Sequence, residues 1–168
     1  MKLRKLEEKD APLMLEWMHD IDVVDNLQTD FMNKTIEDCY SFIKNQSKEN
    51  LHLAVVDEYD EYMGTVSLKN IHDGTAEFAI VIRKQAMGKG YSKYAMSNIL
   101  EYGFSKLRLQ CIYWYVDRKN TRARKFYDKY GYQKTDLNTL LEEVQLVDKK
   151  NLESKSFDWY WMLKKEEM

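Results

Sequence analysis

Apolar positions recur along this chain with two different periods, one typical of helices and one typical of strands. Four segments carry an apolar residue every three to four positions, which predicts amphipathic helices at residues 11–20, 36–47, 92–106 and 121–130. Short runs rich in β-branched and aromatic residues predict strands. These runs are residues 2–7, 51–57, 62–71, 75–82, 109–116, 141–147 and 157–163.

The order of these segments predicts how the strands pair. The strands at 51–57, 62–71 and 75–82 are joined by short polar turns, so they form an antiparallel meander. A helix separates the strands at 75–82 and 109–116, which makes that pair parallel. We therefore expect an α/β (α+β) fold with a mixed, mostly antiparallel sheet of six to seven strands and about four flanking helices.

Two stretches lack either period. Residues 21–34 mix acids with aromatic and aliphatic side chains and are interpreted as a long loop that could include a helical turn. Residues 148–156 are charged and are interpreted as a turn before the last strand. Neither is rich in Gly, Pro or Ser, so no linker is predicted and residues 1–168 form a single domain.

Composition limits the classes of partner. The 168 residues are 44% hydrophobic and 13% aromatic, and the formal net charge is −2, so nothing indicates a nucleic acid or membrane surface. Cys39 and Cys111 lie in apolar patterns, and no signal peptide or membrane-spanning run is visible, which indicates a cytoplasmic protein. We expect a small-molecule partner and a monomer or homodimer.

The most informative stretch is a glycine loop between a strand and a helix. Gly88 and Gly90 follow the strand at 75–82, with Lys89 between them, and a helical pattern starts at Ser92. Glycines let backbone N–H groups converge, and the helix adds its positive end, so the loop suits a phosphate or pyrophosphate. A simple tight turn is the alternative, since Gly-x-Gly after a strand is often no more than that. The P-loop and dinucleotide-binding patterns do not fit this loop.

Two motifs in this order resemble the GNAT superfamily of N-acetyltransferases over essentially the whole chain. Residues 87–92 (MGKGYS) are similar to the family pattern Q/R-x-x-G-x-G/A, with departures at Met87 and Ser92. An alternative register at 85–90 leaves a cofactor contact of Gln85 open. Residues 120–132 (NTRARKFYDKYGY) resemble the family segment N-x-x-A-x-x-F/L-Y-x-x-x-G-F/Y. The branch that acetylates ribosomal-protein N-termini, polyamines and amino sugars is the most similar.

The resemblance implies that acetyl-CoA is the cofactor and that the parallel strands splay apart around it. It places the pantetheine beside Ile80, Val81 and Ile82, where a backbone N–H could also face the developing oxyanion. Asn120 is implied as a cofactor contact, with a helix N-cap as the alternative. The pyrophosphate would bind the loop and first helical turn, which comprise Met87, Gly88, Lys89, Gly90, Tyr91, Ser92 and Lys93. Nearby cations that could neutralise it, or simply be solvated, are Lys84, Lys89, Lys93, Arg122 and Arg124.

Acyl transfer to an amine needs an acid for the leaving thiolate and a base for the ammonium. Tyr127 matches the position of the family's general acid, with a packed core tyrosine as the alternative. Glu77 is the first candidate for the base, being a lone acid in an apolar strand, with an exposed alternating position as the alternative. Further candidates for the base are His72, Asp117 and Tyr115. No metal is implied, because His19, His52 and the cysteines lack partners at metal-ligand spacing.

These expectations describe an acetyl-CoA-dependent N-acetyltransferase for a primary amine of a small molecule. Residues 17–34 and 137–157 correspond to the family's acceptor-binding regions. An amino sugar or nucleotide-linked amino sugar is placed ahead of a polyamine or a protein N-terminus. A non-catalytic acyl-CoA-binding domain and an unrelated nucleotide binder remain as alternatives.

Overall fold

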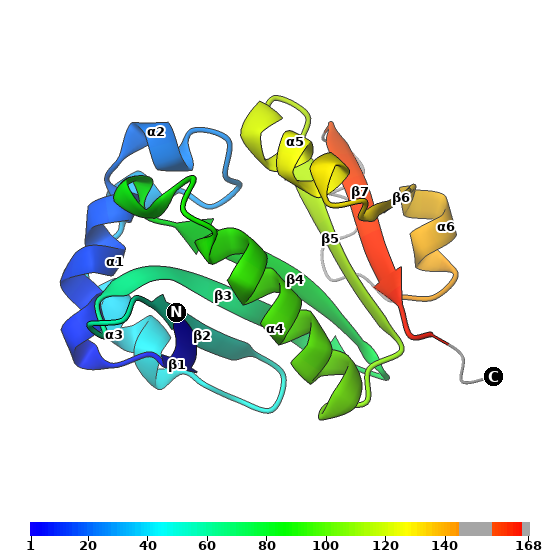
Figure 1. The fold of residues 1–168 in the computed structure, drawn as a ribbon, viewed down its shortest axis with the longest axis horizontal. Helices are drawn as coiled ribbons and strands as arrows, with labels where there is room; N and C mark the ends of the chain where they lie inside the picture. The colour runs from blue at the N-terminus through cyan, green and yellow to red at the C-terminus, as the bar shows by residue number, and fades with distance from the viewer. Residues whose placement is uncertain (145–155, 166–168) are drawn as a thin grey trace.

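The computed structural model describes residues 1–144 and 156–165 and shows one mixed sheet (Figure 1). Its seven strands lie in the order β1-β2-β3-β4-β5-β7-β6. Neighbouring strands are antiparallel except for β4 and β5, which are parallel, as predicted. The strands are β1 (Lys2–Lys5), β2 (Leu51–Val56), β3 (Tyr62–His72), β4 (Thr75–Ile82), β5 (Cys111–Asp117), β6 (Gln133–Thr135) and β7 (Phe157–Leu163).

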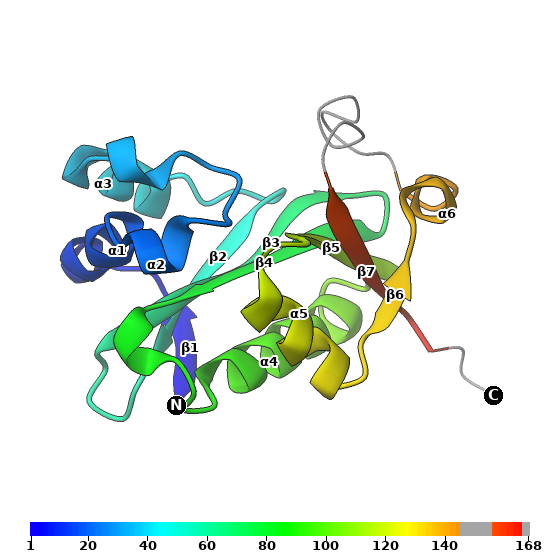
Figure 2. The same cartoon turned by 90° about the horizontal axis from the view of Figure 1, so that it is seen from above.

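Helices cover both faces of this sheet (Figure 2). One face carries α4 and α5, and the other carries α1, α2 and α3 at one end and α6 at the other. The helices are α1 (Ala11–Met18), α2 (Ile21–Val24), α3 (Ile36–Lys44), α4 (Tyr91–Ser105), α5 (Thr121–Lys129) and α6 (Leu137–Leu141). Three short 3₁₀ turns are η1 (Glu8–Asp10), η2 (Phe31–Asn33) and η3 (Lys84–Ala86). No helix in the described ranges has the length and apolar character needed to cross a bilayer.

The C-terminal third differs from the prediction. The strand expected at 141–147 is wrong where it is described, because Leu141 is the last residue of α6. The Asp136 carboxylate caps that helix by accepting the Thr139 backbone N–H at 2.8 Å, and this local bond favours helix over strand. The short strand β6 was missed. Residues 145–147 of that predicted strand, and 148–155 of the expected charged turn, lie outside the described residues.

The loop expected at 21–34, for which one helical turn was considered, contains two, α2 and η2. Asp20 caps α2 through a hydrogen bond from the Asp22 backbone N–H at 3.0 Å, and η2 follows. With α2 and α6, the described residues hold six α-helices where about four were predicted. The additional helices are short, and neither shows the long apolar period on which the prediction depended.

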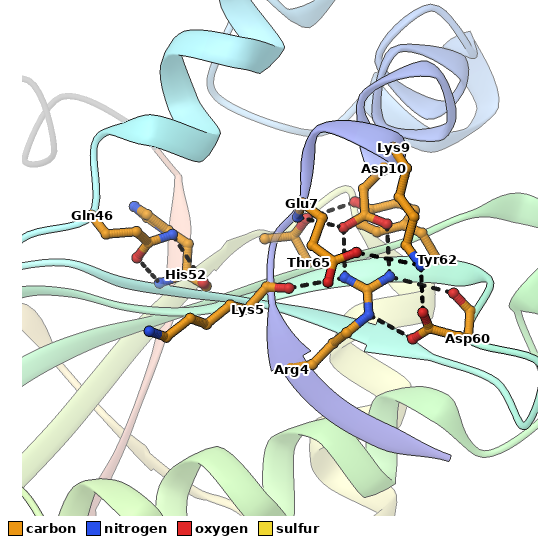
Figure 3. Close-up of polar contacts among 10 residues, drawn as sticks. All are labelled: Arg4, Lys5, Glu7, Lys9, Asp10, Gln46, His52, Asp60, Tyr62 and Thr65. Atoms are coloured by element: carbon orange, nitrogen blue, oxygen red, sulfur yellow. Dashed lines mark hydrogen bonds and ion pairs between the residues drawn. The ribbon is translucent and has the colours of Figure 1, made fainter.

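The N-terminal strand is fixed by a cluster of charged side chains (Figure 3). Arg4 donates two hydrogen bonds of 2.8 Å to the buried Asp10 carboxylate and one of 2.7 Å to Asp60. Lys9 also pairs with Asp60. β1 is an edge strand and pairs only with β2 in the sheet. These side-chain bonds also join it to η1, through Asp10, and to the β2–β3 turn, through Asp60.

Replacing Asp60 should make stability less sensitive to acid. Hydrogen bonds from Lys9 and Arg4 lower the pKa of Asp60 from 3.8 to about 2. A carboxylate with a lowered folded-state pKa stabilises the protein above its unfolded pKa, and this contribution disappears as pH falls from about 4 to 2. Asp60→Asn keeps the shape and tolerates the left-handed backbone at φ 65°.

Urea unfolding at several pH values tests this expectation. The wild type should be more stable than Asp60→Asn at pH 6, and the difference should shrink steadily between about pH 4 and 2. A difference that stays constant across this range would contradict the assignment of the pKa shift to Asp60.

Candidate active site

The parallel strands β4 and β5 pair over only three residues and then separate. Their register ends at Glu77 and Tyr113, although β4 continues to Ile82 and β5 to Asp117. Figure 1 shows the two strands diverging toward η3 on one side and α5 on the other. The diverging segments 78–82 and 114–117 are called the splay below.

The backbone of β4 presents Ile80 and Ile82 to the splay. The Arg83 backbone N–H donates to the Met63 carbonyl at 2.8 Å, so this position is a hydrogen-bonded pair in the β3–β4 ladder. Antiparallel pairs alternate, which directs the backbone groups of Val81 and Ala79 to β3. The N–H and C=O of Ile80 and Ile82 therefore point away from β3, toward the side where β5 has separated. Val81, the third predicted contact, has its backbone groups directed toward β3.

The glycine loop enters α4 through two left-handed residues. Gly88 has φ 76° and Gly90 has φ 88°, a conformation that is strained for other residues. Gly90 is the N-cap of α4, and the Tyr94 N–H makes the first helical bond, to the Gly90 carbonyl at 3.1 Å. The N–H groups of the three preceding residues have no acceptor within the helix. These residues are Tyr91, Ser92 and Lys93, so the loop and helix end form a fitting anion site.

The five cations that sequence analysis placed near the phosphates differ in whether they already form an ion pair. Lys84 pairs with Asp22 at 2.6 Å and Arg124 pairs with Asp158 at 2.8 Å, so both charges are already compensated. The other three form no ion pair in the described part of the chain. They are Lys89 in the loop, Lys93 in the first turn of α4, and Arg122, whose guanidinium contacts the Met87 sulfur across the splay.

Asn120 starts the helix that carries the candidate acid. Its side-chain oxygen accepts the Ala123 backbone N–H at 3.3 Å, so it acts as the N-cap of α5. The side-chain NH₂ group keeps its donors, and a cofactor contact through it stays a prediction. At the other end of α5, Gly131 has φ 71° and forms the expected C-terminal cap.

Tyr127 lies on the inner face of α5, at the edge of the splay. Its side chain is buried and its ring lies 5.6 Å from Trp114 and 5.0 Å from Tyr160. Burial raises the pKa of Tyr127 far above its usual value of 10.0, so the phenol stays protonated at neutral pH. Tyr130, three residues further along the chain, is 39% exposed.

Glu77 lies at the base of the splay on the opposite face of the sheet from Tyr127. Phe78 packs with α4, and the next residue back along a strand faces the other side. The Glu77 side chain is nearly buried and its carboxylate pairs with Lys69 at 3.0 Å. It is therefore neither an exposed alternating position nor an unpaired acid.

The other candidate bases have local partners. His72 pairs with Asp73 at 2.9 Å in the exposed β3–β4 turn. The Asp117 carboxylate accepts the Lys119 N–H at 2.8 Å, and the Tyr115 ring packs on Phe157. In the described ranges, no group of three His, Cys, Asp or Glu side chains could hold a metal ion.

Sequence analysis missed a buried arginine that fixes the start of the glycine loop. Arg83 donates to the Glu16 carboxylate of α1 at 3.0 Å and to the Tyr62 carbonyl at 3.2 Å. It immediately precedes η3, so it ties the loop to α1 and β3. The sequence does show an arginine directly after an apolar strand, which could have marked Arg83 as buried. It could not show the partner, because Glu16 is 67 positions away in the sequence.

A second missed feature is a polar pair beneath α3. His52 Nδ1 and Ser67 Oγ lie 2.6 Å apart on facing positions of β2 and β3. Burial is the main cause that lowers the pKa of His52 to about 4, so the ring is neutral at pH 7. Phe42 covers the ring, with centroids 4.2 Å apart. We therefore interpret His52 and Ser67 as buried polar side chains that satisfy each other's hydrogen bonding, away from the splay.

Comparison with known proteins gives one family and a consistent set of relatives. Residues 1–133 match the acetyltransferase (GNAT) domain. The chain is 30% identical to the uncharacterized N-acetyltransferase p20 of Bacillus licheniformis, over 82% of this chain and 81% of that protein. It is 29% identical to spermidine N(1)-acetyltransferase of Escherichia coli K12, over 79% of this chain and 72% of that protein.

Solved structures agree on the fold. A spermidine N-acetyltransferase from Vibrio cholerae, in complex with CoA and spermine, aligns with a TM-score of 0.75 at 20% identity, covering 96% of this chain and 94% of that chain. A GNAT-family acetyltransferase from Bacillus anthracis aligns with a TM-score of 0.69 at 23% identity, covering 96% of this chain and 92% of that chain. The family match, the relatives and the shared fold lead to one conclusion: the chain belongs to the GNAT acetyltransferases and uses acetyl-CoA as its cosubstrate.

Proposed function

We propose that the chain acetylates a primary amine of a polyamine. The observation that carries this choice is the similarity, at 28–29% identity, to spermidine N(1)-acetyltransferases of Escherichia coli and Vibrio cholerae. This favours the polyamine alternative over the amino sugar that sequence analysis placed first.

The proposed cofactor placement follows from the groups that the fold leaves unpaired. The first turn of α4 and the loop before it hold the pyrophosphate, with Lys89, Lys93 and Arg122 supplying positive charge. The backbone groups of Ile80 and Ile82 pair with the pantetheine as a missing strand would. When bound there, acetyl-CoA supplies an activated acetyl group between the two faces of the sheet.

The side chains on those faces have complementary tasks. Glu77 accepts a proton from the incoming ammonium, directly or through water, because an alkylammonium with a pKa of about 10.4 is not nucleophilic at pH 7. Lys69 holds the carboxylate in place through their ion pair at 3.0 Å. On the α5 side, Tyr127 donates its proton to the departing thiolate. An acid and a base on opposite faces can act on the two sides of one carbonyl carbon.

Removing the carboxylate of Glu77 should slow transfer and move its pH dependence. In Glu77→Gln we expect kcat/KM for the amine to fall by about 10²-fold at pH 7, the usual contribution of a general base. The loss should shrink at pH 9–10, where more of the amine is already neutral. Steady-state thiol release at several pH values measures both effects.

Asp73→Asn is a suitable control, since Asp73 lies in the exposed β3–β4 turn and should leave the profile unchanged. A Glu77→Gln profile parallel to that of the wild type would show that Glu77 is not the base.

A panel of amines tests the acceptor class. Thiol release should be fastest with spermidine or spermine and slower with glucosamine or a short peptide, with acetylated product confirmed by mass spectrometry. Turnover of the amino sugar or peptide ahead of both polyamines would overturn the choice of polyamine. Acetyl-CoA binding without turnover of any amine would favour the non-catalytic acyl-CoA-binding domain, and preferential binding of ATP would favour another nucleotide binder.

A further inference from the structure

Trp114 occupies the point where β5 leaves β4. It follows Tyr113, the last residue of β5 in register with β4. Its ring lies 5.5 Å from the Phe78 ring on the opposite strand and 5.6 Å from the Tyr127 ring on α5. The indole therefore extends from the floor of the splay to the candidate acid.

The indole N–H of Trp114 has no hydrogen-bond partner in the part of the chain that the structure describes. The residue is 1% exposed, and Trp114 Nε1 is one of two buried side-chain polar atoms without a partner among the described residues. Nearly all buried polar groups in folded proteins are paired, so an unpaired donor in a core calls for an explanation. This fold can pair a buried indole, because Trp17 Nε1 donates to the Tyr62 hydroxyl at 2.9 Å.

A neighbouring ring provides an alternative acceptor for this N–H. The Tyr160 ring is stacked nearly parallel to the indole at 7°, so an N–H in the indole plane does not point at its face. The Phe78 and Tyr132 rings are steeply inclined to the indole, at 68° and 83°. A weak N–H···π contact to either would be satisfied with or without a cofactor, which makes the two explanations separable.

We infer that the Trp114 indole N–H is a donor for an oxygen of the acyl-pantetheine arm of acetyl-CoA. The inference rests on the proposed placement of that arm in the splay. There an amide or acetyl oxygen would enter next to Phe78 and Tyr127, two of the four aromatic side chains that surround the indole. The donor would be unpaired in the free protein and paired in the complex, which makes Trp114 a binding and positioning residue.

An isosteric replacement tests this directly. Trp114→benzothienylalanine keeps the bicyclic shape and replaces the N–H with sulfur. The free variant should unfold at the same temperature as the wild type or higher, because an unpaired polar group has been removed. Its affinity for acetyl-CoA by calorimetry should fall by about tenfold, the loss of one hydrogen bond. The same replacement at Trp161, the other unpaired indole, should leave acetyl-CoA affinity unchanged.

The opposite pattern would overturn the inference. A lower unfolding temperature with unchanged acetyl-CoA affinity would show that a ring of the core already satisfies the N–H. If the variant does not fold, the indole ¹H–¹⁵N resonance of Trp114 in the wild type tests the donor role instead. The chain has four tryptophans, so only four indole resonances need to be assigned. It should shift on adding acetyl-CoA, and a resonance that stays fixed while loop resonances move would refute the donor role. If the wild type acetylated none of the amines tested, the proposed function would be refuted instead.

Discussion

Tyr127→Phe should lower kcat by about 10²-fold or more while acetyl-CoA still binds with near wild-type affinity. The ring is packed among Trp114, Tyr132 and Tyr160, and phenylalanine preserves those contacts. No hydrogen bond to the Tyr127 hydroxyl is found among the described residues, so removing it breaks no observed contact. The thiolate would then leave without the proton that the Tyr127 phenol is proposed to donate. Thiol release with spermidine and calorimetry with acetyl-CoA measure the two quantities.

Tyr130→Phe on the same helix is the matched control. Its ring can keep its contact with the Lys93 ammonium, which lies 4.4 Å from the ring centre, and its side chain is exposed, so kcat should stay within about twofold of the wild type. If Tyr127→Phe retained full kcat, the phenol would be a packed core tyrosine and another group, or water, would protonate the thiolate.

Gly90→Ala should weaken acetyl-CoA binding by at least about tenfold, which corresponds to about 1.4 kcal/mol. Gly90 has φ 88°, so a Cβ destabilises this backbone by about 1–2 kcal/mol and favours a rotation out of the left-handed region. That rotation would redirect the N–H groups that start α4, where the pyrophosphate is proposed to bind. Calorimetry with CoA isolates this effect from the chemical step.

Gly74→Ala separates strain from cofactor binding. Gly74 has φ 77° in the β3–β4 turn, at the opposite end of β4 from the loop, so a similar loss of stability is expected. Its affinity for CoA should stay at the wild-type value. Equal affinities for both variants would mean that the loop conformation does not hold the diphosphate.

The sequence was sufficient for most of the fold because its apolar periods are strong where the core is deepest. The meander, the parallel pair and the long helix α4 all follow from long periodic runs, and short polar turns join the strands of the meander. The errors lie where short polar contacts decide the structure. Asp20 and Asp136 each cap a helix of four or five residues, and no periodic pattern of that length distinguishes a helix from a loop or strand.

The candidate site was predictable only as far as its motifs extended. The glycine loop and the segment from Asn120 to Tyr127 were identified from their spacing. The partners of the charged residues were not, because Lys69 opposite Glu77 and Glu16 beside Arg83 depend on strand register and helix packing. The unpaired indole of Trp114 was likewise invisible, since hydrogen-bond satisfaction is a property of the folded core.

Hydrogen exchange at single residues of β4 tests the central claim, that acetyl-CoA lies along this strand in the splay. The N–H groups of Ile80 and Ile82 face away from β3, whereas those of Ala79 and Val81 are directed to β3. Saturating acetyl-CoA should slow exchange at Ile80 and Ile82 and change it little at Ala79 and Val81. Unchanged exchange at Ile80 and Ile82 in protein that binds acetyl-CoA would contradict the claim.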